Sequence, residues 1–259
     1  MELRASNTGG VCQYNIICYI SAYPRKKAAM DGRALREARQ NKNWTQTDAA
    51  RALGVTQAYL SMLETGSRAV SKSFVRKALR VLDLSPTALP LPLPSGRAAT
   101  FSRNHDFGAD LAALGYPKFA YLGTKVRRNP AGVLLYALNE PDLDARVAEG
   151  LPWLALTYFD LDWEWLVRNA KLEDRQNRLG FAVALASEVA EGRGDVRRAQ
   201  KLRGCLEVLD RARLAREDTF CHDSMTPVER AWLRDHRSAV ASHWNLLTDM
   251  EGKHLAYAS

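Results

Sequence analysis

Residues 45–66 read TQTDAARALGVTQAYLSMLETG, and this stretch decides the fold of the first third of the chain. The hydroxyl of Thr45 can accept a hydrogen bond from an unpaired first-turn N–H, which favours the start of a helix. Gly54 can end that helix, because glycine adopts a left-handed conformation at little cost. Thr56 can begin a second helix that ends at Gly66. The stretch therefore predicts two short helices joined by a tight turn.

The second predicted helix has an apolar face and an open face. Leu60 and Leu63 fall on one side of it, together with Val55 from the turn. In a helix-turn-helix, the N-terminal part of the second helix contacts base edges in the major groove of DNA, while the first helix crosses the backbone. Glutamine can pair with adenine, and Ala, Tyr or Met can touch a thymine methyl group. We therefore expect base reading from the open face, which consists of Gln57, Ala58, Tyr59, Ser61 and Met62.

An ordinary helical hairpin with solvated polar side chains would also fit a loose pair of amphipathic helices. Here six features occur together within one short stretch. They are a cap, an Ala-Ala pair, a Gly turn, a Val corner, a Leu-x-x-Leu-Glu run and a terminal Gly. This combination favours DNA binding over the plain hairpin. Gln46, at the start of the first helix, is then placed to contact a phosphate.

With its flanking residues, the stretch resembles the Cro/phage-repressor (XRE) helix-turn-helix family over about residues 32–84. The resemblance implies a structural ion pair between Arg39 of the first helix and Glu64 of the recognition helix. It also implies double-stranded DNA as the ligand and a dimer as the binding form. Ala58 lacks a hydrogen-bonding group, so the target sequence cannot be read from the motif. The side chains expected at the DNA backbone are Gln46, Thr56, Ser67, Arg68 and Lys72, with Arg36 and Lys42 as further phosphate contacts.

The chain has 259 residues and a net charge of +8, and the positive charge is unevenly placed. Residues 1–85 contain 14 Lys and Arg against 6 Asp and Glu, whereas residues 86–259 contain 23 of each kind. The whole excess therefore lies with the helix-turn-helix third, as expected for a module that binds phosphates.

Composition narrows the class of protein further. An apolar content of 46% and a charged content of 25% are typical of a soluble globular protein, and no apolar run is long enough to predict a membrane helix. The cysteines are scattered, and the histidines do not cluster with them at the spacing of zinc ligands. We expect reduced thiols in a cytoplasmic protein with no metal or other cofactor. The cysteines are Cys12, Cys18, Cys205 and Cys221.

The chain as a whole predicts a mostly α-helical protein. We expect a five-helix DNA-binding domain similar to that of lambda repressor at residues 31–88, and an extended, proline-rich linker at residues 89–104. Residues 105–259 predict a larger α-helical interaction or regulatory domain. Within it we expect one long helical segment over residues 163–192 and a small strand or hairpin over residues 119–126. A further helix, which begins near Asp142, can be interrupted at Gly150–Pro152.

Residues 1–30 contain an apolar stretch that no basic segment precedes, so they make a poor signal peptide. We expect them to be an upstream extension with little structure, with the natural start of the protein at Met30. The alternative is a short strand or arm that packs on the dimer.

Three groups of residues in the second half could carry chemistry. Arg and His with five residues between them resemble a pair used by some all-α ribonucleases, but such pairs are expected by chance in an Arg-rich segment. Carboxylates at a helix start more simply face its positive end, and an adjacent Cys and His seldom aim at each other. We therefore expect no enzyme activity, no catalytic residue and no metal site. The groups are Arg237/His243 with Arg230/His236, Asp160/Asp162/Glu164, and Cys221/His222.

Together these features predict a sequence-specific transcriptional regulator, and most simply a repressor that binds a palindromic operator as a dimer. An alternative keeps the DNA binding but makes the protein an antitoxin, which represses its own operon and captures a toxin through residues 105–259. The charge-neutral helical domain that follows a stiff linker is the feature that favours this alternative.

Overall fold

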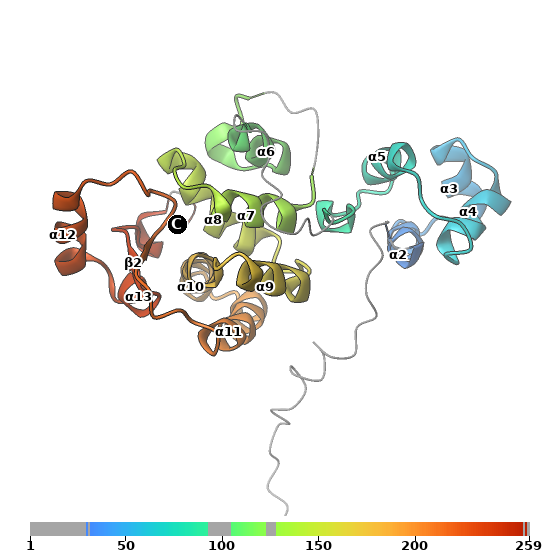
Figure 1. Ribbon diagram of the computed structural model, residues 1–259. Helices are drawn as coiled ribbons and strands as arrows, with labels where there is room; N and C mark the ends of the chain where they lie inside the picture. Colours follow the sequence, from blue (N-terminus) through green and yellow to red (C-terminus); the bar gives the residue numbers. More distant parts are fainter. Residues whose placement is uncertain (1–29, 31, 93–104, 123–127, 256, 258–259) are drawn as a thin grey trace, which may run out of the picture.

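The structure is a computed structural model that describes residues 30, 32–92, 105–122, 128–255 and 257. Within these residues the protein is mostly α-helical, as predicted, with a smaller helical group at one end and a larger one at the other (Figure 1). Each group has its own hydrophobic core. The expected extension at residues 1–29 and most of the expected linker, residues 93–104, lie outside the described residues.

Four short α-helices and one 3-10 turn build the smaller core. Each α-helix contributes leucines to it, and Leu35, Leu53, Leu63 and Leu79 are almost fully buried. The expected five-helix arrangement is therefore present, with a single 3-10 turn as its fifth helix. The elements are α2 (Gly32–Asn41), α3 (Gln46–Leu53), α4 (Gln57–Glu64), α5 (Lys72–Val81) and η1 (Pro86–Ala88).

The ends of α3 and α4 follow the local signals of the sequence. Thr45 Oγ1 accepts a hydrogen bond from Asp48 N at 3.2 Å, and the Asp48 carboxylate accepts one from Thr45 N at 3.1 Å, which completes a capping box. Gly54 ends α3 in the left-handed conformation at φ 61°. Thr56 Oγ1 accepts from Tyr59 N at the start of α4. Residues close in sequence therefore set the turn between the two helices.

Helix α2 lies directly against the C-terminal end of α4. A Cβ atom at Gly32 would stand 2.0 Å from the carbonyl oxygen of Leu63 and 2.8 Å from that of Glu64. Both oxygens belong to the backbone, so glycine is needed for this close approach. The same packing places Arg39, further along α2, within reach of Glu64.

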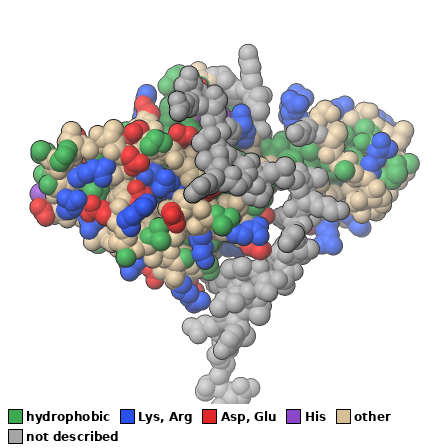
Figure 2. Space-filling model, viewed as in Figure 1, with side chains coloured by type: hydrophobic (Ala, Val, Ile, Leu, Met, Phe, Trp, Pro, Cys, Tyr) green, Lys and Arg blue, Asp and Glu red, His purple; other side chains and the backbone are tan. Residues whose placement is uncertain are grey.

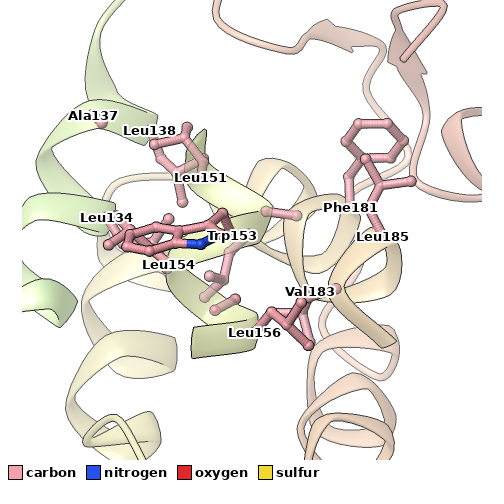
Figure 3. Close-up of a cluster of buried hydrophobic side chains, with 14 of the residues drawn as sticks. Leu134, Ala137, Leu138, Leu151, Trp153, Leu154, Leu156, Phe181, Val183 and Leu185 are labelled. Atoms are coloured by element: carbon pink, nitrogen blue, oxygen red, sulfur yellow. The ribbon is translucent and has the colours of Figure 1, made fainter. Parts of the chain in front are cut away.

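The larger core surrounds α10 (Gln176–Gly192), which is buried along most of its length. Its main neighbours are α8 (Ala145–Thr157) and α11 (Val196–Asp210), and α7 (Pro130–Asn139) packs on α8. A helix that is apolar on nearly all sides requires such cover. Figure 3 shows buried side chains that α7, α8 and α10 contribute to this core, among them Leu134, Leu138, Trp153, Leu154, Phe181 and Leu185.

Shorter elements complete this larger group. Two strands of two residues each, β1 (Asp218–Thr219) and β2 (Leu246–Leu247), pair in parallel. In the described part of the chain, no helix is long and apolar enough to cross a membrane. The remaining elements are α6 (Phe107–Leu114), η2 (Pro117–Phe119), α9 (Trp163–Leu172), α12 (Pro227–His236), α13 (Ala239–His243) and η3 (Gly252–His254).

Three local predictions for this group were wrong. Residues 163–192 form two helices, α9 and α10, because the chain turns at Asp174, whose φ is 55°. Helix α8 continues through Pro152 instead of being interrupted there. Residues 119–122 belong to η2 and a turn rather than to a strand, and residues 123–126 lie outside the described part.

A buried arginine ties the loop after α11 to the core. The guanidinium of Arg178 on α10 is fully buried and donates two hydrogen bonds to Asp218, at 2.8 and 2.9 Å, and one to Asp223 at 2.9 Å. It also donates to the carbonyl of Glu140 at 2.9 Å. Burial raises the pKa of Asp218, but the hydrogen bonds and charge of Arg178 outweigh burial and lower it. The pair therefore remains charged inside the fold.

The segment between the two cores is attached to the larger one. Asn129 is buried at the N-terminus of α7, and its Nδ2 donates hydrogen bonds to the carbonyls of Leu89 at 2.6 Å and Thr87 at 3.1 Å. Its Oδ1 accepts from Ala131 N at 2.9 Å, so the same side chain caps α7. Thr87 Oγ1 in turn donates to Asp160 at 3.0 Å. We call the contacts among Thr87, Leu89, Asn129 and Asp160 the Asn129 clasp.

Apolar contacts accompany the clasp. Leu89 packs against the smaller core, whereas Leu91 packs against the larger one. Pro92 lies beside α7, where a Cβ atom at Gly132 would come within 3.1 Å of the proline ring. The first residues of the expected linker therefore touch both helical groups.

Candidate DNA-binding surface

Helix α4 presents most of the side chains expected to read bases. Gln57, Ala58 and Met62 are exposed, and 40% of the Met62 surface is accessible. Tyr59 and Ser61 are half-buried. The opposite face, with Leu60 and Leu63, lies in the smaller core. The open face of α4 thus agrees with the amphipathic pattern of the sequence, except that Tyr59 and Ser61 are less accessible than the other three side chains.

A chain of hydrogen bonds joins four of the expected site residues. Arg39 Nε and Nη2 donate to the two oxygens of Glu64 at 2.7 and 3.0 Å, which is the expected ion pair. Gln46 Nε2 donates to Glu64 Oε2 at 3.0 Å. Gln57 Nε2 donates to Gln46 Oε1 at 2.6 Å. Through this chain Gln57, the first of the side chains expected to read bases, is connected to the ion pair behind it.

The ion pair is shielded from water. The side chain of Glu64 is 2% exposed and that of Arg39 is 11% exposed. Burial raises the pKa of Glu64, but the hydrogen bonds from Arg39 and Gln46 and the charges of Arg39 and Arg36 outweigh it, so the pKa lies below its usual range. The hydrogen bond to Glu64 raises the pKa of Arg39. Both groups therefore remain charged at neutral pH.

Tyr59 and Arg68, which we expected to act separately, are in contact. The guanidinium carbon of Arg68 lies 5.1 Å from the centre of the Tyr59 ring. The same ring also meets Phe74 of α5 edge-on, with ring centres 6.2 Å apart. Arg68 N also donates to the Met62 carbonyl at 3.1 Å, which holds the loop after α4 against that helix.

The other side chains expected at the DNA backbone are spread around α4. Thr56 and Ser67 are exposed, and Ser67 Oγ lies 2.9 Å from Thr65 Oγ1. Lys72 is the first residue of α5, but its side chain is outside the described part. Lys42 forms an ion pair with Asp83, so its charge is partly engaged within the fold.

A cleft of about 340 Å³ lies beside the ion pair, and the sequence alone did not indicate it. Two arginines of α2, Arg33 and Arg36, line it together with Gln46 and Glu64. Arg33 was not among the expected site residues, because a single arginine on a helix carries no signal of its own. The cleft places positive charge next to the glutamine expected to contact a phosphate.

Charge is distributed differently over the two helical groups. In the view of Figure 2, positive and negative side chains alternate over the larger group, while the smaller group shows mainly positive and hydrophobic ones. This agrees with the charge asymmetry of the sequence, in which residues 86–259 are balanced. A surface with excess positive charge attracts the phosphates of nucleic acid.

The first Arg–His pair of the larger group is not assembled as a unit. His243 Nε2 bonds to Asp210 at 2.8 Å, and its Nδ1 lies 3.1 Å from Arg213 Nη1. Arg237 instead donates to the carbonyl of Leu246 at 3.3 Å. The two side chains therefore have separate partners.

The second Arg–His pair is likewise divided. Arg230 Nη2 donates to the carbonyl of Asp223 at 2.7 Å. His236 stacks on Trp232, with ring centres 4.3 Å apart and planes 5° from parallel. The geometry gives neither pair a common target.

The remaining chemical candidates have structural contacts. Asp162 caps α9 by accepting from Trp165 N at 3.1 Å, while Asp160 belongs to the Asn129 clasp. Cys221 is buried, and burial raises the pKa of its thiol to about 11. Among the described residues, no group of three or more His, Cys, Asp or Glu side chains could hold a metal ion.

The comparisons with known proteins bear on the smaller helical group. Residues 35–89 match a family model described as Helix-turn-helix. The match runs from within α2 through α3, α4, α5 and η1, and it includes every site residue described on that group except Arg33. No curated protein and no solved structure shows a significant match to the chain.

Proposed function

We propose that this protein, whose residues 35–89 form a Cro/repressor-type DNA-binding helix-turn-helix, is a transcriptional repressor that binds a palindromic operator as a dimer. The hydrogen-bond chain from Arg39 and Glu64 through Gln46 to Gln57 is the observation that carries the proposal. A base-reading amide that is held before DNA arrives loses less freedom on binding. One recognition helix covers a half-site, so a palindrome requires two copies.

The exposed side chains divide into two roles. Gln57, Ala58 and Met62 face the base edges, where a glutamine can pair with adenine and a methionine can contact a thymine methyl group. Arg68 and Ser67 lie in the loop after α4 and hold the DNA backbone. The phosphate contacts supply affinity for any sequence, and the base contacts supply preference among sequences.

The test is DNA binding by the full chain, measured by fluorescence anisotropy. The probes are a sequence selected from a random duplex library, the segment upstream of the gene itself, and an unrelated duplex. Gln57→Ala should weaken binding to the selected sequence by about 1–3 kcal/mol in binding free energy. The ratio of the affinities for the selected and the unrelated duplex should therefore decrease. Arg68→Ala should weaken binding to every probe and reduce the salt dependence by about one phosphate contact.

Arg216→Ala is the matched control, because Arg216 is an exposed arginine of the larger helical group. It should leave binding to all three probes unchanged. Failure of the selection to enrich any sequence, together with equal affinity for all probes, would overturn the proposal of a sequence-specific repressor.

A second candidate function, that of an antitoxin, is favoured by α12. Val228 and Trp232 lie one turn apart on this helix, and they are 78% and 52% exposed. Exposed aromatic and aliphatic pairs of this kind are typical of protein interfaces. The partner would be a toxin encoded beside this gene, captured through the larger helical group.

Co-expression with the neighbouring gene tests this second function. The tagged protein should retain the untagged neighbour product on a column, and Trp232→Ala should release it. Leu172→Ala is the control, because Leu172 is a 73% exposed apolar residue on a different helix, α9. If the neighbour product is absent from the column eluate in both the wild type and the control, the antitoxin function is excluded for that pair.

A further inference from the structure

We infer that Tyr59 is a positioning residue for Arg68, and that it holds the arginine for a DNA phosphate instead of reading bases. The inference rests on the proposed function and deepens it. Tyr59 is one of five side chains on α4 that the sequence places in the groove. Its surroundings in the fold separate it from the other four.

The ring of Tyr59 is held from the side of α5. Phe74, which is itself buried, meets the ring edge-on at 6.2 Å and an interplanar angle of 73°. This geometry is a favourable one for two aromatic rings. Tyr59 is half-buried, as Ser61 is, whereas Gln57, Ala58 and Met62 are exposed, and of the five side chains it is Tyr59 that packs on an aromatic ring. The ring therefore has less freedom to follow a base edge than its neighbours on the helix have.

Arg68 is held at two points. Its backbone N–H donates to the Met62 carbonyl at 3.1 Å, and its guanidinium carbon lies 5.1 Å from the centre of the Tyr59 ring. Both contacts join Arg68, in the loop after α4, to a residue of that helix, and Gly66 of the same loop has a φ of 74°. Among the described residues, no carboxylate forms an ion pair with Arg68. Its charge is therefore not neutralised by such a partner.

Stacking on a ring leaves the N–H groups of a guanidinium available at its edge. These donors can then reach phosphate oxygens in a paired geometry. An exposed arginine on a flexible stem must give up side-chain freedom when it binds, and a ring that already holds it reduces that loss. A cation–π contact at an exposed site corresponds to about a two- to five-fold effect on an equilibrium.

The assignment changes which residues can set the operator sequence. Tyr59 and Arg68 act as one unit, and phosphate contacts carry no direct sequence information. Base reading by α4 is then left to Gln57, Ala58, Ser61 and Met62.

A double-mutant cycle with the full chain tests the inference. Tyr59→Leu should weaken binding about two- to five-fold on the selected duplex and by the same factor on an unrelated duplex. In the Arg68→Ala background the same substitution should have no further effect, because the partner is absent. Tyr59→Phe keeps the ring and should bind as the wild type does.

Two outcomes would overturn the inference. One is a loss with Tyr59→Leu that is confined to the selected duplex, as expected if Tyr59 reads a base. The other is additivity of Tyr59→Leu with Arg68→Ala. If the wild type binds neither duplex, the proposed function fails, and the arginine–ring contact is then judged by a measurement without DNA.

That measurement is the NMR shift of the Arg68 side-chain protons in the free protein. The δ protons should be shifted upfield by the Tyr59 ring in the wild type and in Tyr59→Phe, and the shift should disappear in Tyr59→Leu. If Tyr59→Leu fails to fold, the spectra of the wild type and of Tyr59→Phe still show whether the ring shifts the Arg68 δ protons. Unshifted δ protons in the folded wild type would contradict the contact.

Discussion

Gln57 Nε2 donates a 2.6 Å hydrogen bond to Gln46 Oε1, and this bond joins the first turns of α4 and α3 across the helix-turn-helix. Gln46 is held in place from behind, because its own Nε2 donates to the buried carboxylate of Glu64. The side chain expected to contact a phosphate is thus also the support of a side chain expected to contact a base.

Replacement of Gln46 by Leu should therefore reduce sequence preference as well as affinity. The variant loses the bonds to Gln57 and Glu64, and each such bond is worth about 0.5–1.5 kcal/mol. Fluorescence anisotropy should show that the affinity for the selected duplex falls about ten-fold. The affinity for the unrelated duplex should fall by a smaller factor. Gln40→Ala, an exposed position on α2, is the control. An equal loss on both duplexes would show that Gln46 contacts only the backbone.

The Arg39–Glu64 pair should control the stability of the helix-turn-helix. Arg39→Met leaves the carboxylate of Glu64 buried without its cation, which costs about 3–5 kcal/mol in free energy of unfolding. The double variant Arg39→Met/Glu64→Met should recover most of that loss, since no buried charge remains. The unfolding free energies of the single and the double variant are measured by denaturant titration, with circular dichroism as the signal. A double variant no more stable than Arg39→Met would contradict this account.

The same pair predicts a dependence on pH. The pKa of Glu64 in the fold lies below its usual value of 4.5, so its stabilising contribution is complete above 4.5 and is lost as pH falls through the lowered value. In Arg39→Met only burial and weaker partners remain, and burial raises this pKa. The difference in unfolding free energy between wild type and variant should therefore shrink from pH 7 to pH 4. A constant difference would exclude the linkage.

Gly32→Ala should disrupt the packing of α2 on α4. Alanine is the better helix former by about 1 kcal/mol, but its Cβ would stand 2.0 Å from the Leu63 carbonyl oxygen. We expect the free energy of unfolding, measured by thermal or denaturant unfolding, to fall by about 1–3 kcal/mol. Gly192→Ala is the control at a helix end, where a Cβ would meet no atom within 4 Å. A stabilised Gly32→Ala protein would show that the two helices are not packed this closely.

The Asn129 clasp should restrict motion between the two helical groups. Asn129→Asp keeps an oxygen to cap α7 but loses the donor to the carbonyls of Thr87 and Leu89. Circular dichroism should remain unchanged, while ¹⁵N relaxation should report faster tumbling of residues 32–84 than in the wild type. Thr87→Val removes the hydroxyl contacts with Asp160 and Ser85 but keeps Asn129, and it should have a smaller effect. Identical relaxation in all three proteins would show that the clasp does not restrict this motion.

The thiols of Cys205 and Cys221 should resist alkylation in the folded protein. Both are buried, and burial raises their pKa values to about 12 and about 11. At pH 8 both remain protonated, and the thiolate is the reactive form. Peptide mass spectrometry after brief iodoacetamide treatment should find them modified only in denaturant. Rapid modification of Cys221 in the native protein would show that its loop opens.

The sequence by itself determined the elements whose causes are local. Thr45 and Thr56 cap their helices through bonds to residues three positions ahead, and Gly54 ends α3 through its own backbone conformation. Such contacts lie within one turn of helix, so residue type and spacing are enough to predict them. The Arg39–Glu64 pair was implied by family resemblance, because the two residues are far apart in the chain.

Only the tertiary structure decided how the site residues act together. The link from Gln57 to Gln46, the contact of Tyr59 with Phe74 and the approach of α2 at Gly32 each join separate helices. The Asn129 clasp likewise joins residues that are about 40 positions apart. These contacts depend on the angles at which helices pack, and many residue types are compatible with any one angle. For that reason helix positions could be read from the sequence, whereas the partners of their side chains could not.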